Sequence, residues 1–166
     1  MKNLLFLLPV ALFACTPPPD DAALRGQLQQ QQAQIDSLRK ELAAAQPGLG
    51  ERMSLVQTHH AKLWYAGLYG NWPLADFELD EIQEQLDAAK GLAATRPEVI
   101  HLPMLDPALD SLRQSVARKD NAAFKTAFET LTRTCNDCHV SNHFEFNVIT
   151  VPTSPPVPNQ DFKAQR

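Results

Sequence analysis

Five consecutive residues near the end of the chain, Cys135-Asn136-Asp137-Cys138-His139, restrict the possible folds more than any other stretch. Two thiols three residues apart, followed at once by a histidine, form the pattern that attaches a c-type haem. Each cysteine adds to one vinyl group of the porphyrin, and the histidine then lies beside the ring as the proximal iron ligand. The motif therefore predicts one covalent haem on Cys135 and Cys138, with His139 on the iron.

Three other roles for this pair of cysteines are a redox Cys-x-x-Cys pair, half of a zinc site and a disulfide. A thioredoxin-like pair would accompany a βαβ pattern, which this sequence lacks. A zinc site would need further ligands at matching spacing, and the chain does not offer them. We therefore expect haem attachment, which the export signal at the N-terminus also favours.

The N-terminus has the features of an export signal. Lys2 gives a positive start, and residues 4 to 13 form an apolar core that is too short for a stable membrane span. The segment Leu12-Phe13-Ala14-Cys15 resembles the lipobox of bacterial lipoproteins, in which the signal (here residues 1–14) is removed and the cysteine is lipidated. A plain secretory signal, or a buried thiol in a longer hydrophobic stretch, are the alternatives.

The cysteine count agrees with lipidation of Cys15. The chain has three cysteines, and none is left for a structural disulfide once lipid and haem take theirs. Thr16 in the second mature position resembles lipoproteins sorted to the outer membrane. We expect a periplasmic protein that is lipid-anchored to the outer membrane of a Gram-negative bacterium. The net charge of -4 offers no basic surface for nucleic acid.

A proline-rich tether, residues 15–21, precedes a glutamine-rich segment, residues 22–47. Apolar residues of the second segment recur at the a and d positions of a heptad, with Gln31 in one d position, over about three heptads. They are Leu24, Leu28, Ile35, Leu38 and Leu42. This pattern predicts a helical stalk that spaces the haem domain from the membrane and self-associates as a coiled coil; a solvated single helix and a disordered spacer are the alternatives.

Residues 48–144 are predicted to form four amphipathic helices. We expect them at about 49–69, 72–92, 106–118 and 121–139, separated by turns and by a proline-rich loop around residues 93–105. Asn71 or Trp72, and Asp120 or Asn121, are candidate N-caps. The acids Asp76, Glu78, Asp80 and Glu81 are expected to be solvated. In the last helix, Cys135 and Cys138 continue the apolar stripe of Phe124, Phe128 and Leu131.

The proline-rich segment 145–166 cannot be helical. We expect an irregular or strand-like tail that lies across the bundle and covers an exposed porphyrin edge; a disordered tail is the alternative.

A haem clip on the last of four helices resembles cytochrome c′ and other class II cytochromes c. The resemblance covers roughly residues 49–144, and it implies an up-down-up-down four-helix bundle. The segment from His60 to Gly67, with Gly70-Asn71-Trp72, also looks like a set of bacterial haem lipoproteins. The lipid anchor, stalk and tail depart from typical soluble class II members, so the resemblance leaves partners and activity open.

The other side of the iron is expected to face the first bundle helix. Counting along antiparallel helices places Met53 nearest to His139 and makes it the candidate distal ligand, while His60, two turns deeper, is the alternative. His59 is expected on an exposed neighbouring face and His143 on the surface near the haem rim. His101 and Met104 are minor ligand candidates in the loop.

Two functions follow from these expectations. The first is electron transfer between periplasmic or membrane-bound redox proteins through a Met/His-ligated haem. The second is binding or sensing of NO or CO at a five-coordinate iron, as in cytochrome c′, with Val56 or Leu55 over the open face. A peroxidase would need a distal acid/base residue, for which His60 is the only obvious candidate. No catalytic residue is predicted.

Overall fold

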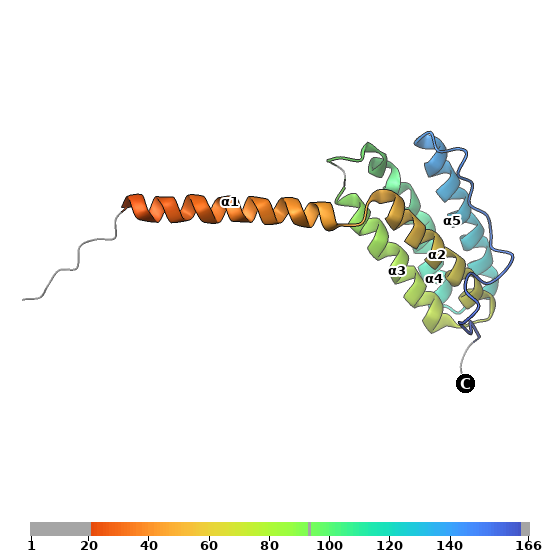
Figure 1. The fold of residues 1–166 in the computed structure, drawn as a ribbon. Coiled ribbons are helices and arrows are strands. Elements are labelled where there is room, and N and C mark those ends of the chain that lie inside the picture. The colour runs from red at the N-terminus through yellow and green to blue at the C-terminus, as the bar shows by residue number, and fades with distance from the viewer. Residues whose placement is uncertain (1–20, 93, 164–166) are drawn as a thin grey trace, which may run out of the picture. The chain divides into compact units, whose positions relative to one another are not determined.

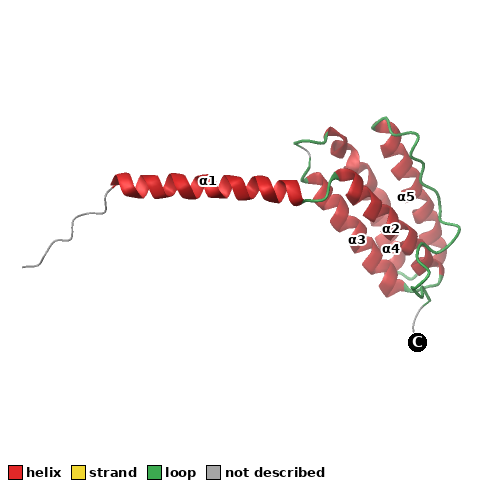
Figure 2. Cartoon of the chain, viewed as in Figure 1, coloured by secondary structure: helices red, strands yellow, loops and turns green. Residues whose placement is uncertain are grey.

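The computed structural model describes residues 21–92 and 94–163. Their regular structure is entirely helical, and these two ranges contain no strand (Figures 1 and 2). The elements are α1 (Asp21–Ala45), α2 (Leu49–Leu68), α3 (Trp72–Lys90), the 3₁₀ helix η1 (Pro97–Leu105), α4 (Asp106–Ala117) and α5 (Asn121–Ser141). The helices expected from the sequence are therefore confirmed. The predicted signal peptide, the lipid site Cys15 and nearly all of the tether lie outside the described residues.

The chain divides into two compact units, residues 1–46 and 47–166. In the first unit, α1 is a helix of 25 residues, none of which is buried. The four leucines and one isoleucine of its heptad pattern are all between 43% and 64% exposed. No described helix has the length and apolar character needed to cross a bilayer.

In the second unit, α2, α3, α4 and α5 pack side by side into a helical bundle (Figure 1). Each helix turns its apolar stripe inward, as periodicity predicted. The largest fully buried apolar side chains are Leu63, Leu79, Ile82, Leu86, Leu109, Leu112, Phe124, Phe128 and Leu131. Two helix starts are capped as expected: Asn71 accepts from the Leu74 backbone amide and Asp120 from that of Ala123.

Close packing between α2 and α5 requires glycine at one position. A Cβ atom added to Gly67 would lie 2.2 Å from the Phe124 ring, well inside van der Waals contact. The missing side chain lets the fully buried Phe124 ring approach the α2 backbone.

Three bundle helices end in the same reverse turn, a Schellman motif with one residue in the left-handed region. These residues are Gly70 (φ 70°), Lys119 (φ 55°) and His143 (φ 62°). After α5, the Phe144 amide donates to the His139 carbonyl and the His143 amide to the Val140 carbonyl. This last turn directs the chain back along the bundle.

The segment between α3 and α4 differs from the prediction of a loop, because residues 97–105 form a 3₁₀ helix. Val99, Leu102 and Leu105 are buried, and their spacing of three matches the three residues per turn of this helix. Pro97 starts the segment, where no amide donor is needed, and Pro103 inside it removes an amide donor that a regular α-helix would use. The α-helical and strand periods used to interpret the sequence both miss such a repeat.

The tail after α5 is irregular, as expected, and is bound to the bundle. Asn136 bonds the backbone of Ile149 near the tail's start. Near its end, Phe162 is buried against Tyr65, and Asn71 donates to the Lys163 carbonyl. The alternative of a disordered tail is wrong for residues 144–163.

Candidate functional site

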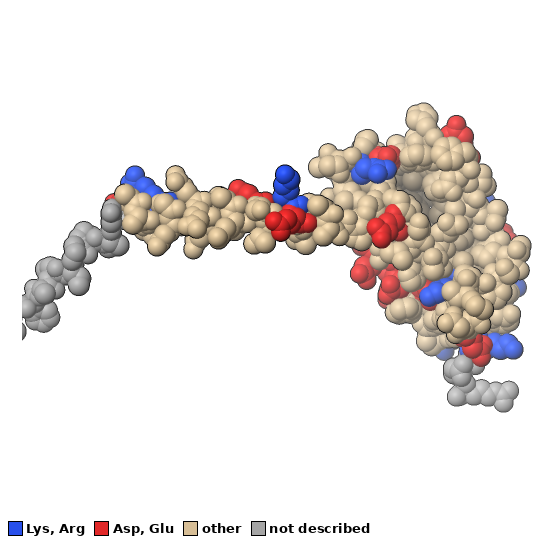
Figure 3. Space-filling view, in the orientation of Figure 1, with Lys and Arg blue, Asp and Glu red and all other residues tan. Residues whose placement is uncertain are grey.

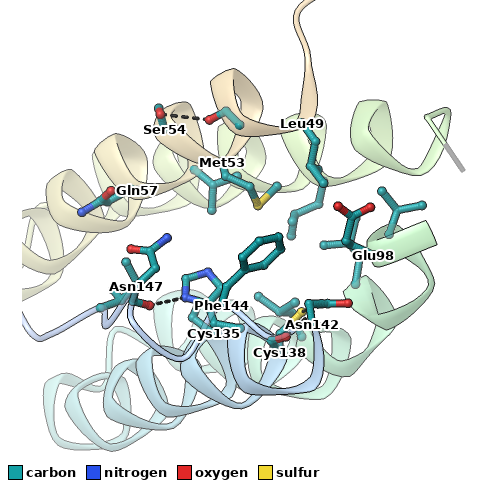
Figure 4. A pocket seen from close by; sticks show the side chains of 18 of the residues that line it. Leu49, Met53, Ser54, Gln57, Glu98, Cys135, Cys138, Asn142, Phe144 and Asn147 are labelled. Carbon is teal, nitrogen blue, oxygen red and sulfur yellow. Dashed lines mark hydrogen bonds between the residues drawn. The ribbon is translucent and has the colours of Figure 1, made fainter. Parts of the chain in front are cut away.

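A cavity of about 340 Å³ lies within the second unit, between α2, η1, α5 and the tail (Figure 4). Its volume falls in the range of small-molecule and cofactor sites. It is lined mainly by apolar side chains, among them Leu49, Met53, Val56, Leu102 and Phe144. The cavity also brings together all five predicted haem-site residues, which are Cys135, Cys138, His139, Met53 and His60.

The two cysteines lie on the α5 wall of the cavity as free thiols. Burial raises the pKa of the Cys135 thiol to about 12, and the neighbouring Cys138 adds to the rise. Burial also raises the pKa of Cys138. Both side chains are therefore protonated at neutral pH, whereas a redox Cys-x-x-Cys pair depends on a lowered thiol pKa and a reactive thiolate.

No group of three or more His, Cys, Asp or Glu side chains in the described part of the chain is arranged to hold a metal ion.

His139 is half-buried at the end of α5, one residue beyond Cys138. Its Nδ1 lies 2.5 Å from the backbone carbonyl oxygen of Asn147 in the tail. A carbonyl oxygen can only accept, so Nδ1 carries the proton in this contact. In the neutral ring, Nε2 then keeps its lone pair, as a metal-binding imidazole requires.

Met53 reaches the cavity from the opposite wall. It is half-buried on α2, and Figure 4 shows its sulfur in the space between α2 and α5. The Phe144 ring, from the turn after α5, projects into the same space. Met53 thus lies on the cavity wall facing the two cysteines.

His60 lines the inner part of the cavity but is engaged elsewhere. Its Nε2 lies 2.9 Å from Thr132 Oγ1, and its ring stacks on Phe128 with centroids 4.3 Å apart. Thr132 donates its own proton to the Phe128 carbonyl, so His60 Nε2–H is the donor between the two side chains. Burial lowers the pKa of His60 to about 4, which keeps the ring neutral.

The expectation that His59 is exposed is wrong. Its side chain is 13% exposed, and Nδ1 donates to Glu78 Oε2 over 2.7 Å. Glu78, expected on a solvated face, is fully buried, while Asp76 and Asp80 are exposed as expected. Figure 3 shows acidic side chains gathered over α3. Helical periodicity places Glu78 beside the inward Leu79 but cannot reveal its partner on another helix.

The minor ligand candidates lie apart from the cavity lining. His101 bonds Asn142 Oδ1 over 2.7 Å through its Nδ1. Met104 and His143 are exposed, His143 as expected. Leu55 is exposed, whereas Val56 lines the cavity.

Sequence reasoning missed several residues that shape the site. Asn142, the C-cap of α5, bonds the Cys138 carbonyl, and Asn136 within the cysteine–histidine motif bonds Ile149 of the tail. Phe144, Asn147 and Ile149 line the cavity. Only their position within or just after the motif could have suggested them.

Comparison of the chain with protein-family models, with curated proteins and with solved structures found no match. The functional argument therefore depends on the residues and geometry of the cavity.

Proposed function

We propose that this protein is a lipid-anchored, periplasmic c-type cytochrome that carries one haem and transfers electrons between periplasmic or membrane-bound redox proteins. The haem domain is an up-down-up-down four-helix bundle of the class II cytochrome type. The observation that carries the proposal is the cavity itself. It gathers two free thiols, an imidazole with an available Nε2 and a thioether around one apolar space.

The chemistry of this donor set suits a c-type haem. Cys135 and Cys138 would hold the porphyrin through thioether bonds, and His139 would bind the iron through Nε2. The apolar side chains that α2 and η1 contribute to the lining suit a porphyrin face. When bound, the haem supplies one-electron redox chemistry, whose potential depends on the axial ligands and burial.

Met53 is the distal ligand that the geometry favours. Its thioether faces the cavity, and no proton has to leave before it can bind a metal. The His60 ring is instead held within the buried core, where its Nε2 bonds Thr132 and the ring stacks on Phe128. We therefore assign His60 a packing role beneath the haem site.

The first test is the visible spectrum of the ferrous protein, produced in cells that attach haem, before and after carbon monoxide. Electron transfer through a Met53/His139 pair predicts sharp low-spin bands that carbon monoxide does not change. Met53→Ala should become high-spin and bind carbon monoxide, whereas His60→Gln should keep the low-spin bands. Absence of a Soret band in the wild-type protein would overturn the proposal.

A second candidate function is binding or sensing of NO or CO at a five-coordinate iron. Val56 and Phe144 favour it, because both are apolar and line the cavity near Met53. It predicts a broad high-spin spectrum that shifts with carbon monoxide in the wild-type protein. Met53→Ala would then leave that spectrum unchanged.

The membrane anchor is proposed on Cys15, through a lipid added after cleavage of residues 1–14. Radiolabelled palmitate should enter the wild-type protein in cells, and the protein should fractionate with outer membranes. Cys15→Ser should lose the label and appear in the soluble periplasmic fraction. A wild-type protein without label would contradict lipidation.

We also propose that α1 self-associates as a coiled coil. All five heptad apolar side chains are exposed on a helix with no buried residue, and they follow the a and d positions that a second copy would cover. Sedimentation of the lipid-free Cys15→Ser protein should show a dimer or higher oligomer. Ile35→Ser with Leu38→Ser should return it to a monomer, while Gln30→Ser with Ala33→Ser, on the outer face, should not. A monomeric starting protein would overturn self-association.

A further inference from the structure

The second residue of the haem motif, Asn136, is bonded to the tail through both polar atoms of its side chain. Asn136 Nδ2 donates to the Ile149 carbonyl over 2.9 Å, and the Ile149 amide donates to Asn136 Oδ1 over 2.7 Å. A side-chain amide can satisfy both backbone groups of one residue because it carries a donor and an acceptor. This pair of bonds sets which tail residue lies beside Asn136.

His139, about one turn further along α5, bonds the same stretch of tail through the Asn147 carbonyl. The chain leaves α5 through the reverse turn at His143 and runs back antiparallel to the helix. Residues further along the tail therefore lie beside residues nearer the start of α5. A shift of the tail by one residue would move the Asn147 carbonyl away from His139 Nδ1. The Asn136–Ile149 and His139–Asn147 contacts therefore both depend on the same alignment of the tail with α5.

We propose that Asn136 is a positioning residue for the proximal histidine. By binding Ile149 it holds the tail in register, and the tail then presents the Asn147 carbonyl to His139. The carbonyl keeps the proton on Nδ1, so that Nε2 is the nitrogen available to the iron. The inference deepens the proposed function and rests on it, because it gives the tail a part in setting the axial ligand.

The far end of the tail provides an internal comparison. Phe162 is buried against Tyr65, some distance along the chain from the haem motif. That contact fastens the tail to the bundle without setting its register beside α5. Loosening it should free the tail's end and leave the Asn136 and His139 bonds in place.

The experiment compares Asn136→Ala, Asn136→Asp and Phe162→Ala in the full chain. Asn136→Ala removes both bonds, Asn136→Asp keeps only the acceptor, and Phe162→Ala is the tail-loosening control. Amide hydrogen exchange at Ile149 reports the register contact. The ¹⁵N shifts of the His139 ring report which nitrogen holds the proton or the iron, with or without haem.

In Asn136→Ala we expect the Ile149 amide to exchange about tenfold faster, as for loss of one hydrogen bond. The His139 Nδ1–H signal should broaden or shift. In haem-loaded protein, the EPR signal of the iron, which depends on its axial ligands, should split. Asn136→Asp should give a smaller change of the same kind, because the Ile149 amide keeps its acceptor. Phe162→Ala should accelerate exchange only near residue 162.

Two results would overturn the inference. One is unchanged exchange at Ile149 in Asn136→Ala; the other is faster exchange with unaltered His139 ring shifts. A failure of the proposed function can be distinguished from a failure of this inference, because the wild-type protein would then contain no haem. In that case the ring shifts of the haem-free protein still decide whether Asn136 orients His139.

Discussion

Helices α1 and α5 are similar in length, at 25 and 21 residues, but different interactions stabilise them. No residue of α1 is buried, whereas α5 contributes Phe124, Phe128 and Leu131 to the core. The sequence of α1 is rich in alanine, glutamine and leucine, which favour helix intrinsically. In contrast, α5 contains four threonines, which favour helix poorly.

Local contacts support α1, including side-chain bonds from Gln32 to Asp36 and from Ser37 to Glu41. Each such pair contributes only roughly 0.2–0.5 kcal/mol to the stability of the helix. Burial of a large aromatic side chain in α5 contributes several times more. A regular helix can thus be dictated by its own sequence or imposed by its neighbours, and here α5, a helix of the second kind, lines the cavity.

The largest expected effect is at Phe128, which packs against His60 and Trp64. Phe128→Ala should lower the free energy of unfolding of the bundle by about 3–5 kcal/mol, because it leaves a cavity in the core. Urea unfolding followed by tryptophan fluorescence measures this. Gln30→Ala, on the outer face of α1, is the control and should change bundle stability by less than about 0.5 kcal/mol. Equal losses would refute the contrast between the two helices.

The buried His60 should make the bundle sensitive to acid. Its folded pKa of about 4 lies below the unfolded value of 6.5, so the unfolded state binds the proton first as pH falls. Stability should be unaffected by His60 above pH 6.5 and should drop by about 3 kcal/mol between pH 6.5 and 4. Urea titrations across this window should show a shallower drop in His60→Gln. An identical pH dependence in that variant would remove His60 as the cause.

The buried His59–Glu78 pair between α2 and α3 should contribute more to stability than the more exposed Arg113–Asp80 pair between α3 and α4. His59→Ala leaves the fully buried Glu78 carboxylate without its hydrogen-bond donor and should cost about 1–3 kcal/mol. Disrupting the more exposed Arg113–Asp80 pair with Asp80→Ala should cost less than about 1 kcal/mol. Thermal unfolding of both variants ranks the two effects, and a reversed order would contradict the importance of burial here.

The smallest predicted effect is at His143, whose positive φ disfavours a side chain. His143→Gly should stabilise the bundle by up to about 1 kcal/mol, as relief of left-handed strain exceeds the entropy cost of glycine. Lys119→Gly, at the equivalent turn after α4, should act in the same direction. Chemical denaturation midpoints would show the change. Destabilisation at both positions would mean that the turns tolerate their side chains without strain.

Much of the bundle was predictable because local periodicity carries the information. Leu79, Ile82 and Leu86 follow a helical stripe, and all are buried. The caps at Asn71 and Asp120 follow from residue type and position alone. The two cysteines and Met53 were expected on inward-facing helical stripes, and the structure places all three on the wall of one cavity.

Periodicity shows which face of a helix is buried, but it does not show which residue of another helix a buried side chain contacts. His59 and Glu78 are far apart in sequence, and only the packing of α2 on α3 joins them. The 3₁₀ helix η1 is not predictable from periodicity, because its repeat of three residues lies between the α-helical and strand repeats.

By itself, the sequence determined the helices, their buried faces and the cysteine–histidine motif, since each depends on residues within a few positions of one another. The tertiary structure alone decided that Asn136 holds Ile149, that the Asn147 carbonyl meets His139, and that Phe144 enters the cavity. These contacts depend on a reverse turn after α5 and on the path of an irregular tail. Hydrogen bonds between distant segments leave no periodic trace in a sequence, because their geometry exists only once the chain has folded.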